Sequence, residues 1–244
     1  MLSVKPWKIV TVMRLMFGVV ICFCSMWLVE GVAAHQLGLD GPGKTSFLLQ
    51  LTQILSVHGA IVLSTWYVLA SEGISWSAAF GFARETNGRA IRMGIIAALV
   101  FLPVGMVLQW ASGEVLSWLH INLAEEQAVR SLREANSWLS RGLMTVFAVV
   151  IAPVAEEILF RGVFYAAIKQ MGYPRLALWG TSLFFALIHG DLGIFVPLTV
   201  LAVVLAKLYE RTDNLWANIA AHATFNICGV VMVFLTEHGK VNPS

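Results

Sequence analysis

The segment AEEILFRGVFYAAIKQ, residues 155–170, places three charged side chains inside a strongly apolar run. At the middle of a bilayer each charge costs about 2.5 to 3.5 kcal/mol, so Glu156, Glu157 and Arg161 together cost on the order of 8 to 10 kcal/mol. The strongly apolar residues between 146 and 160 return only about 3 to 5 kcal/mol. Because three unpaired charges cannot be tolerated, we expect Glu157 and Arg161, four residues apart with the acid first, to pair on one helix face.

Glu156 points to a different face of the same helix and needs a partner from another segment. In FALIHG, Phe185 and His189 are four residues apart, and in HATFN the same spacing joins His222 and Asn226. Each of these pairs shares one helix face. Counted from the charged end of each predicted helix at 1.5 Å per residue, the polar groups lie roughly 13 to 20 Å deep. The sequence predicts that Glu156, His189, His222 and Asn226 meet inside the membrane.

This set of side chains suits the hydrolysis of a peptide bond. A carboxylate withdrawn from water is a stronger base, so we expect Glu156 to activate a water molecule that His189 orients. His222 and Asn226 offer hydrogen-bond donors for a developing oxyanion, a contact worth about 3 to 4 kcal/mol in acyl transfer.

A metal site is the alternative for the same residues. Glu156, His189 and His222 can hold a zinc ion and leave one position open for water. The helical zinc signature HExxH is absent from the sequence. We therefore predict a site that requires no cofactor or metal, with zinc as the alternative.

Polar side chains in membrane helices also have a purely structural explanation. Hydrogen bonds between helices hold a bundle together, and a buried histidine often does no more than this. The combination of two Glu, one Arg, two His and one Asn within the last 90 residues favours a site instead. Polar residues of the first two apolar segments lack such mutual spacing and are interpreted as packing or cavity-lining residues: Glu30, Gln50, Gln53, Ser56 and His58.

A membrane-embedded helix bundle must position these residues. Hydrophobic residues make up 58% of the 244 residues and charged residues 12%, whereas soluble domains carry about 25% charged residues. A bilayer core of about 30 Å needs roughly 20 apolar helical residues, with every backbone polar group satisfied internally. We predict an all-α polytopic bundle in one domain, 1–244, with catalytic helices in 143–236 and N-terminal spans with a connector in 1–142. The spans are expected near residues 15–34, 47–70, 93–111, 143–168, 176–189, 192–209 and 215–235.

One of these spans, residues 176–189, is only about 21 Å long as a helix, too short to cross unassisted. Either the helix continues past His189, or the chain turns there at Gly190 within the protein, where irregular backbone is tolerated if it lines a cavity.

Charge predicts the orientation and one further element. The net charge of +2 offers no basic surface for nucleic acid. Residues 114–137 mix leucines with charged residues, which indicates either an amphipathic helix at the membrane interface or a plain surface connector between two spans. By the positive-inside rule we expect an inner-membrane protein with a cytoplasmic N-terminus, because the basic residues gather at one end of the spans: Lys5, Lys8, Arg14, Arg84, Arg89, Arg92, Lys169, Arg175, Lys207 and Arg211.

The three motifs resemble a known family. EEILFR at 156–161, FALIH at 185–189 and HATFN at 222–226 match in order and spacing the EExxxR, FxxxH and HxxxN motifs of the CAAX-protease and bacteriocin-processing family of Abi-type intramembrane proteases. The resemblance covers roughly residues 148–230. It implies a multi-spanning endopeptidase of the glutamate type, in which Glu156 and His189 activate water while His222 and Asn226 form the oxyanion hole. By the same resemblance, Glu157, Arg161 and Phe185 are expected to support the site.

The leading hypothesis is therefore an intramembrane protease that cuts a membrane-associated protein or peptide within the lipid bilayer. A non-enzymatic membrane protein that keeps the fold, such as an immunity factor or a scaffold, is the second hypothesis. A proton-coupled carrier would also use buried Glu and His, but the sequence contains no evident inverted repeats of the kind that carriers show.

Overall fold

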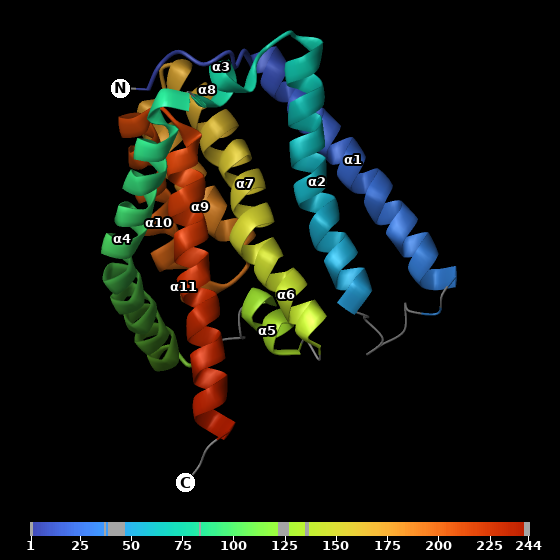
Figure 1. The fold of residues 1–244 in the computed structure, drawn as a ribbon, viewed down its shortest axis with the longest axis vertical. Coiled ribbons are helices and arrows are strands. Elements are labelled where there is room, and N and C mark those ends of the chain that lie inside the picture. Colours follow the sequence, from blue (N-terminus) through green and yellow to red (C-terminus); the bar gives the residue numbers. More distant parts are fainter. Residues whose placement is uncertain are drawn as a thin grey trace.

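The computed structural model describes residues 2–36, 38, 47–82, 84–121, 127–134 and 137–241, and every regular element in these ranges is helical (Figure 1). The predicted all-α bundle is confirmed. The elements are α1 (Ile9–Gln36), α2 (Phe47–Ser71), α3 (Trp76–Phe80), α4 (Arg84–Trp118), α5 (Gln127–Glu134), α6 (Trp138–Val146), η1 (Phe147–Ile151), α7 (Ala152–Glu157), η2 (Ile158–Tyr165), α8 (Ala166–Gln170), α9 (Pro174–Ile188), α10 (Leu192–Thr212) and α11 (Leu215–Val241).

The helices divide into long membrane spans and shorter connecting pieces. Within the described ranges, six segments are long and apolar enough to cross a membrane: Ile9–Gln36, Leu51–Ser71, Trp76–Trp118, Trp138–Gln170, Leu192–Thr212 and Leu215–Thr236. The predicted span at 176–189 corresponds to α9, which is apolar but has only 15 residues. The protein is therefore a multi-pass membrane protein in which one predicted span is a shorter helix.

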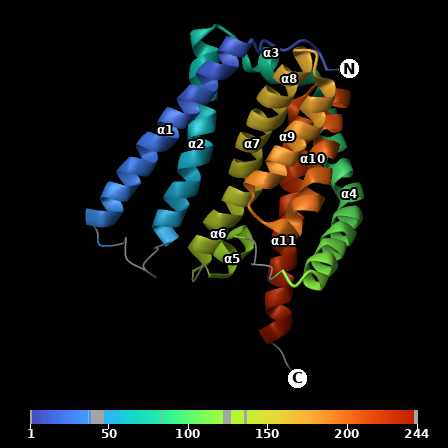
Figure 2. The same cartoon turned by 180° about the vertical axis from the view of Figure 1, so that it is seen from behind.

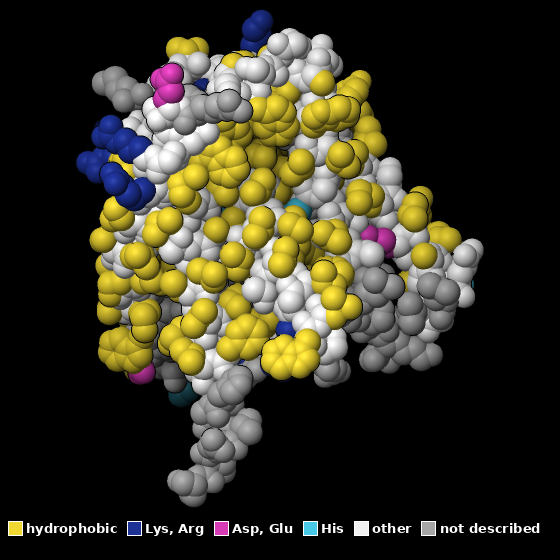
Figure 3. All heavy atoms as spheres, viewed as in Figure 1, with side chains coloured by type: hydrophobic (Ala, Val, Ile, Leu, Met, Phe, Trp, Pro, Cys, Tyr) yellow, Lys and Arg dark blue, Asp and Glu magenta, His cyan; other side chains and the backbone are white. Residues whose placement is uncertain are grey.

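The outer surface of the bundle is apolar. Large hydrophobic side chains such as Phe17, Trp27 and Trp110 are more than 60% exposed. Figure 3 shows hydrophobic side chains over most of one face, while Lys and Arg side chains gather mainly toward one end. An exposed apolar surface of this extent is that of a protein whose solvent is lipid.

The α1–α2 hairpin stands beside a bundle formed by α4, α7, α9, α10 and α11 (Figures 1 and 2). In this bundle α11 and α10 both pack against α4, and α10 also packs against α9. Gly94 of α4 permits the closest approach, since a Cβ there would lie 2.1 Å from the carbonyl oxygen of Ala217 in α11. Small residues let membrane helices approach in this way. The hairpin meets the bundle through α7 and η2.

The amphipathic helix predicted for residues 114–137 is shorter in the structure. Residues 114–118 form the last turn of α4, and the separate helix is α5 at 127–134, while 122–126 and 135–136 lie outside the described residues. Leu132 of α5 is buried against Met144 and Val233, whereas Arg130 and Arg133 are exposed. The element is amphipathic as predicted, but its predicted bounds were wrong because α4 continues through the charged residue Glu114.

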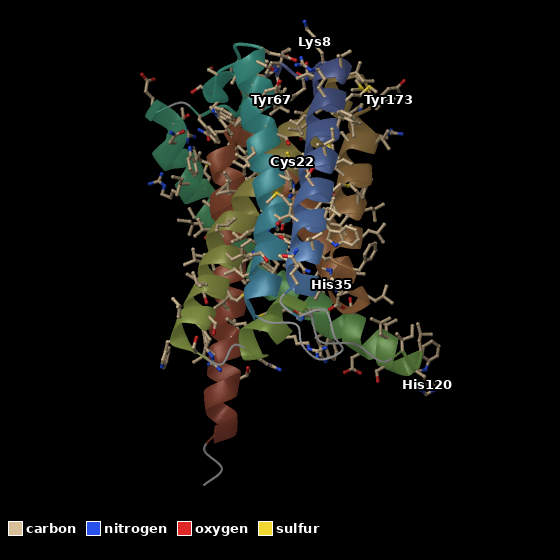
Figure 4. The ribbon with its side chains drawn as sticks, turned by 90° about the vertical axis from the view of Figure 1, so that its right-hand side faces the viewer. Lys8, Cys22, His35, Tyr67, His120 and Tyr173 are labelled. Atoms are coloured by element: carbon tan, nitrogen blue, oxygen red, sulfur yellow. The ribbon has the colours of Figure 1, made fainter. Side chains whose placement is uncertain are left out.

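Figure 4 shows how the chain crosses the bundle. Lys8, Tyr67 and Tyr173 lie at one end, and His35 and His120 lie at the opposite end. Lys8 precedes α1 and His35 lies in its last turn, while Tyr67 lies near the end of α2. The two helices of the hairpin therefore run antiparallel, and the N-terminus starts at the same end as the α8–α9 turn that contains Tyr173.

The N-terminal segment lies across that end of the bundle and is anchored to the α10–α11 turn (Figure 1). The Nζ atom of Lys5 lies 2.8 Å from Oδ1 of Asp213, and its side chain is only 2% exposed. The backbone amide of Ser3 donates to the same oxygen at 3.2 Å. Burial by itself raises the pKa of Asp213, but the hydrogen bonds from Lys5 and Ser3 outweigh it and hold this pKa below its ordinary value.

This anchor predicts a stability that depends on pH. Because the pKa of Asp213 is lower in the folded chain, the carboxylate stabilises the fold at neutral pH, and this contribution is lost as the pH falls through the lowered pKa. We expect Asp213→Asn to lower the thermal unfolding midpoint in detergent at pH 7, and the difference from wild type to shrink as the pH is lowered below about 4. Asn suits the left-handed conformation of residue 213, whose φ is 50°.

The control is Glu114→Gln, which removes an exposed carboxylate and should leave the midpoint at pH 7 unchanged. A difference between Asp213→Asn and wild type that stays constant from pH 7 to pH 3 would contradict the assigned role of the charge.

Candidate active site

The candidate site surrounds a helix whose hydrogen bonding changes register on both sides. α7 lies between the π-helical segments η1 and η2, and it ends at Glu157. In a π-helix the amide bonds five residues back, which adds a residue to the turn and shifts the face that later side chains present. Such turns occur frequently at functional sites. Glu156 and Glu157 therefore lie where α7 passes into η2. There, the direction in which their side chains point does not follow from α-helical periodicity alone.

Glu157 and Arg161 form a fully enclosed ion pair. Arg161 Nη1 donates to Glu157 Oε1 at 2.7 Å, and the two side chains are 2% and 0% exposed. The pairing predicted from their spacing is present. Two residues of α11 join it: His222 Nδ1 lies 2.9 Å from Glu157 Oε1, and Asn218 Nδ2 donates to Glu157 Oε2 at 3.4 Å. Arg161 Nη2 also donates to the carbonyl of Ala202 in α10 at 3.3 Å.

The aromatic ring of Phe185 in α9 packs against the ion pair through Arg161. Its ring centroid lies 4.6 Å from the guanidinium carbon of Arg161, a cation–π contact. The same ring lies 4.8 Å from the ring of His189 and 5.8 Å from that of His222. Phe160 of η2 packs edge-on against it at 5.1 Å. The Phe of the FxxxH spacing thus contacts one residue from each of the other two motifs.

His189 occupies the end of α9, where the chain turns. It is the C-cap residue, and the following Gly190 has a φ of 67°, which favours glycine. Asp191 then caps α10 by accepting a hydrogen bond from the amide of Gly193 at 2.7 Å. Of the two possibilities for the short predicted span, the turn is therefore the one observed. The Nδ1 atom of His189 is held 2.7 Å from the carbonyl oxygen of Phe185.

Glu156 is approached by histidines from three helices. Its Oε2 lies 3.8 Å from His222 Nε2, and its Oε1 lies 3.5 Å from His58 Nε2. His189 is also close enough to interact with its charge. The Glu156 side chain is 17% exposed, unlike that of Glu157. Of the two adjacent acids Glu156 and Glu157, only Glu156 is therefore accessible to a ligand.

His58 and Asn218 are site residues that the sequence interpretation missed. Asn218 lies four residues before His222, so a third polar residue on the same helical stripe was the available signal. His58 was interpreted as a packing or cavity-lining residue, and it lies 98 residues from Glu156. No helical spacing links residues on different helices, so only the packing of α2 against α7 brings His58 to the carboxylate.

Asn226 is used by the backbone of η1. The amide of Ala152 bonds to the carbonyl of Phe147, five residues back, so in this register the next amide would serve the carbonyl of Ala148. That residue is Pro153, which has no N–H. Asn226 Nδ2 donates to the carbonyl of Ala148 at 2.8 Å instead. One N–H of the Asn226 amide remains for another acceptor.

The structure therefore brings the predicted residues into one region, with different contacts for each. Glu157, Arg161, Phe185 and His222 form a continuous network, and Glu156 and His189 border it. Asn226, one turn beyond His222 in α11, contacts the carbonyl of Ala148 instead. Across the described part of the chain, no three His, Cys, Asp or Glu side chains are arranged to hold a metal ion. The set predicted for zinc, Glu156, His189 and His222, is therefore not arranged in this way either. The catalytic roles and the need for a metal stay predictions.

Comparison with known proteins finds a family to which this region is similar. Residues 138–228 match the family model described as type II CAAX prenyl endopeptidase Rce1-like. The segment contains every predicted site residue from Glu156 to Asn226. This segment is therefore similar to the CAAX prenyl endopeptidase family. The resemblance inferred from the three motifs is thereby confirmed.

Three bacterial proteins are similar to parts of this chain. "Putative membrane peptidase YdiL" of Bacillus subtilis is 31% identical over 90 residues, which are 37% of this chain and 37% of the relative. "Uncharacterized protein YpbD" of the same organism is 33% identical over 81 residues, 32% of this chain and 39% of the relative. "UPF0177 protein YbdI" of Lactococcus lactis is 26% identical over 144 residues, 56% of this chain and 74% of the relative. The chain thus spans little more than a third of the first two relatives. No solved structure matches the chain.

The enclosed ion pair predicts an asymmetry between single and double substitutions. Arg161→Met leaves the Glu157 carboxylate buried without its cation, which should cost about 3 to 5 kcal/mol of unfolding free energy. The double variant Glu157→Gln with Arg161→Met removes both charges and should recover most of this loss. Denaturant unfolding in detergent micelles measures both values.

Arg175→Met serves as the control, because Arg175 is exposed at the start of α9, and it should change the unfolding free energy by less than about 0.5 kcal/mol. A double variant as unstable as Arg161→Met alone would show that lost packing, and not the unpaired charge, causes the effect.

Proposed function

We propose that the protein is an intramembrane endopeptidase of the glutamate type, which hydrolyses a peptide bond in a membrane-associated protein or peptide. The observation that carries the proposal is the placement of Glu156. Its carboxylate lies between histidine side chains of different helices and next to a buried ion pair. The family match of residues 138–228 supports the same class of reaction.

In the proposed reaction Glu156 acts as the general base. Its carboxylate accepts a proton from a water molecule, and the resulting hydroxide attacks the carbonyl carbon of the scissile bond. His189, held at the end of α9 by the carbonyl of Phe185, orients that water. When the tetrahedral intermediate collapses, the C–N bond breaks and the leaving amine takes up the proton.

His222 and Asn226 supply donors for the oxyanion in this proposal. Glu157 accepts the Nδ1–H of His222, the relation in which a buried carboxylate orients a histidine and stabilises its protonated form. When the proton that Glu156 took from water passes to His222 Nε2, 3.8 Å away, that nitrogen becomes a donor to the oxyanion. When the C–N bond breaks, His222 gives this proton up to the leaving amine. The N–H of Asn226 that does not bond Ala148 is the second donor.

The orientation proposed for the protein follows from its basic end. The N-terminus, Lys8 and Tyr173 lie at one end of the bundle (Figure 4), where Lys5, Lys169 and Lys207 form ion pairs. By the positive-inside rule this end faces the cytoplasm. We propose a multi-pass protein of the inner membrane, with its site within the bilayer and with membrane-associated substrates.

The decisive test compares cells that carry wild-type protein, Glu156→Gln or His189→Ala. We expect both variants to abolish processing of a membrane protein that the wild type cuts, because each removes a group that activates water. Mass spectrometry of the membrane proteome should find an uncut precursor that accumulates in both variants and a new terminus only with the wild type.

His120→Ala is the matched control, since His120 lies at the end of the bundle opposite the N-terminus (Figure 4), and it should process normally. Cleavage that persists in Glu156→Gln, in protein inserted at wild-type level, would refute the assignment. A cellular phenotype that survives in every inactive variant would favour the alternative of a non-enzymatic immunity factor or scaffold.

The zinc alternative is tested separately. The proposed mechanism needs no metal, so purified protein should contain less than about 0.1 zinc per chain by elemental analysis, and a chelator should leave cleavage unchanged. Protein ligands bind a structural or catalytic zinc ion tightly, so such an ion would remain in the purified protein. One zinc per chain, with activity lost on its removal and restored on its return, would replace the glutamate mechanism by metal-assisted hydrolysis through Glu156, His189 and His222.

A further inference from the structure

His58 is a titratable side chain at the site to which the proposed reaction assigns no role. It lies in the middle of α2, outside the family-matched segment 138–228. Its Nε2 atom lies 3.5 Å from Glu156 Oε1, and its side chain is 14% exposed. Of the described contacts between the α1–α2 hairpin and the bundle, this one reaches the proposed general base.

The ring of His58 is fixed from two sides. Its Nδ1 atom lies 2.8 Å from the carbonyl oxygen of Ile54, one turn earlier in α2. A carbonyl oxygen only accepts, so Nδ1 must be the donor and carries a proton. Phe147 of η1 packs against the ring, with centroids 4.8 Å apart and an interplanar angle of 84°. His58 therefore has one orientation and presents Nε2 to Glu156.

The tautomer of His222 is fixed in the same way. Its Nδ1 atom faces Glu157 Oε1, an oxygen that also accepts from Arg161, so Nδ1 carries the proton. Glu156 thus has one imidazole Nε2 beside each oxygen, His58 at Oε1 and His222 at Oε2. A carboxylate between two Nε2 atoms is held by attraction only when a proton lies between it and at least one of them.

These contacts come from opposite sides of the catalytic helix. α2 supplies His58 and α11 supplies His222, while Glu156 itself stands where α7 passes into η2. Because the π-helical junction leaves the direction of the side chain open, contacts at both oxygens are needed to fix the plane of the carboxyl group.

We propose that His58 is a positioning residue for Glu156. His58 donates from its Nε2 to Oε1 of Glu156, and this leaves Oε2 of Glu156 directed toward His222 and the attacking water. The inference deepens the proposed endopeptidase function and rests on it. It makes the α1–α2 hairpin part of the active site, because withdrawal of α2 from α7 removes one of the two contacts that orient the base.

Three substitutions distinguish the roles of the two ring nitrogens of His58 from the role of its aromatic packing. His58→Gln places an amide N–H near the position of Nε2 and keeps a donor to Glu156. His58→Asn places its amide near Nδ1, so it keeps the bond to Ile54 and loses the donor to Glu156. His58→Phe keeps the aromatic packing on Phe147 and loses both hydrogen bonds.

The experiment incubates purified full-length protein in detergent with solubilised membranes from cells that lack it, and follows new peptide termini by mass spectrometry. Initial rates at several membrane concentrations separate kcat from KM for wild type, the three His58 variants and Glu156→Gln. The thermal unfolding midpoint of each variant reports folding independently of cleavage.

We expect His58→Gln to retain kcat within about threefold, and His58→Asn and His58→Phe to lose about 10- to 100-fold in kcat at nearly unchanged KM. The role of His58 would be overturned if His58→Gln were as slow as His58→Phe. It would also be overturned if all three His58 variants cleaved at the wild-type rate while Glu156→Gln was inactive, and either result would leave the proposed function intact. Full activity of Glu156→Gln would overturn both. If His58→Phe does not fold, the comparison of Gln with Asn decides in the same way.

Discussion

The buried ion pair between Glu157 and Arg161 is the constraint on which the rest of the structure depends. Two charges at membrane depth are tolerated only if they are paired and if their remaining hydrogen-bonding capacity is used. The structure meets this condition from three directions: the carbonyl of Ala202 from α10, the side chains of Asn218 and His222 from α11, and the face of Phe185 from α9. The pair therefore fixes where these three helices stand around α7 and η2.

The irregular backbone on both sides of α7 follows the same rule. A carbonyl freed inside a membrane must find another donor, since no water is at hand. Pro153 removes the amide that would bond Ala148, and Asn226 replaces it. Asn226, predicted to be an oxyanion donor, thus holds the helix that carries Glu156 in register, which ties the direction of Glu156 to the position of α11.

The α1–α2 hairpin has a different relation to the site. It lies outside the segment that matches the family, and much of α1 is exposed as expected of a helix facing lipid. The hairpin is held together in part by polar contacts, among them a hydrogen bond between Ser56 of α2 and Glu30 of α1. Ser56 also bonds the carbonyl of Thr52.

The amino-acid sequence by itself determined what depends on local spacing and on the solvent. Composition required an all-α membrane bundle, the i,i+4 spacing specified the Glu157–Arg161 pair, and the spacing of Phe185 and His189 placed both on one face of α9. These features follow from helical periodicity and from the cost of unpaired charge in lipid. Only the tertiary structure decided that His58 faces Glu156 and that α9 ends at His189. Contacts between residues on separate helices depend on how the helices pack, and no repeat along a single helix encodes that arrangement.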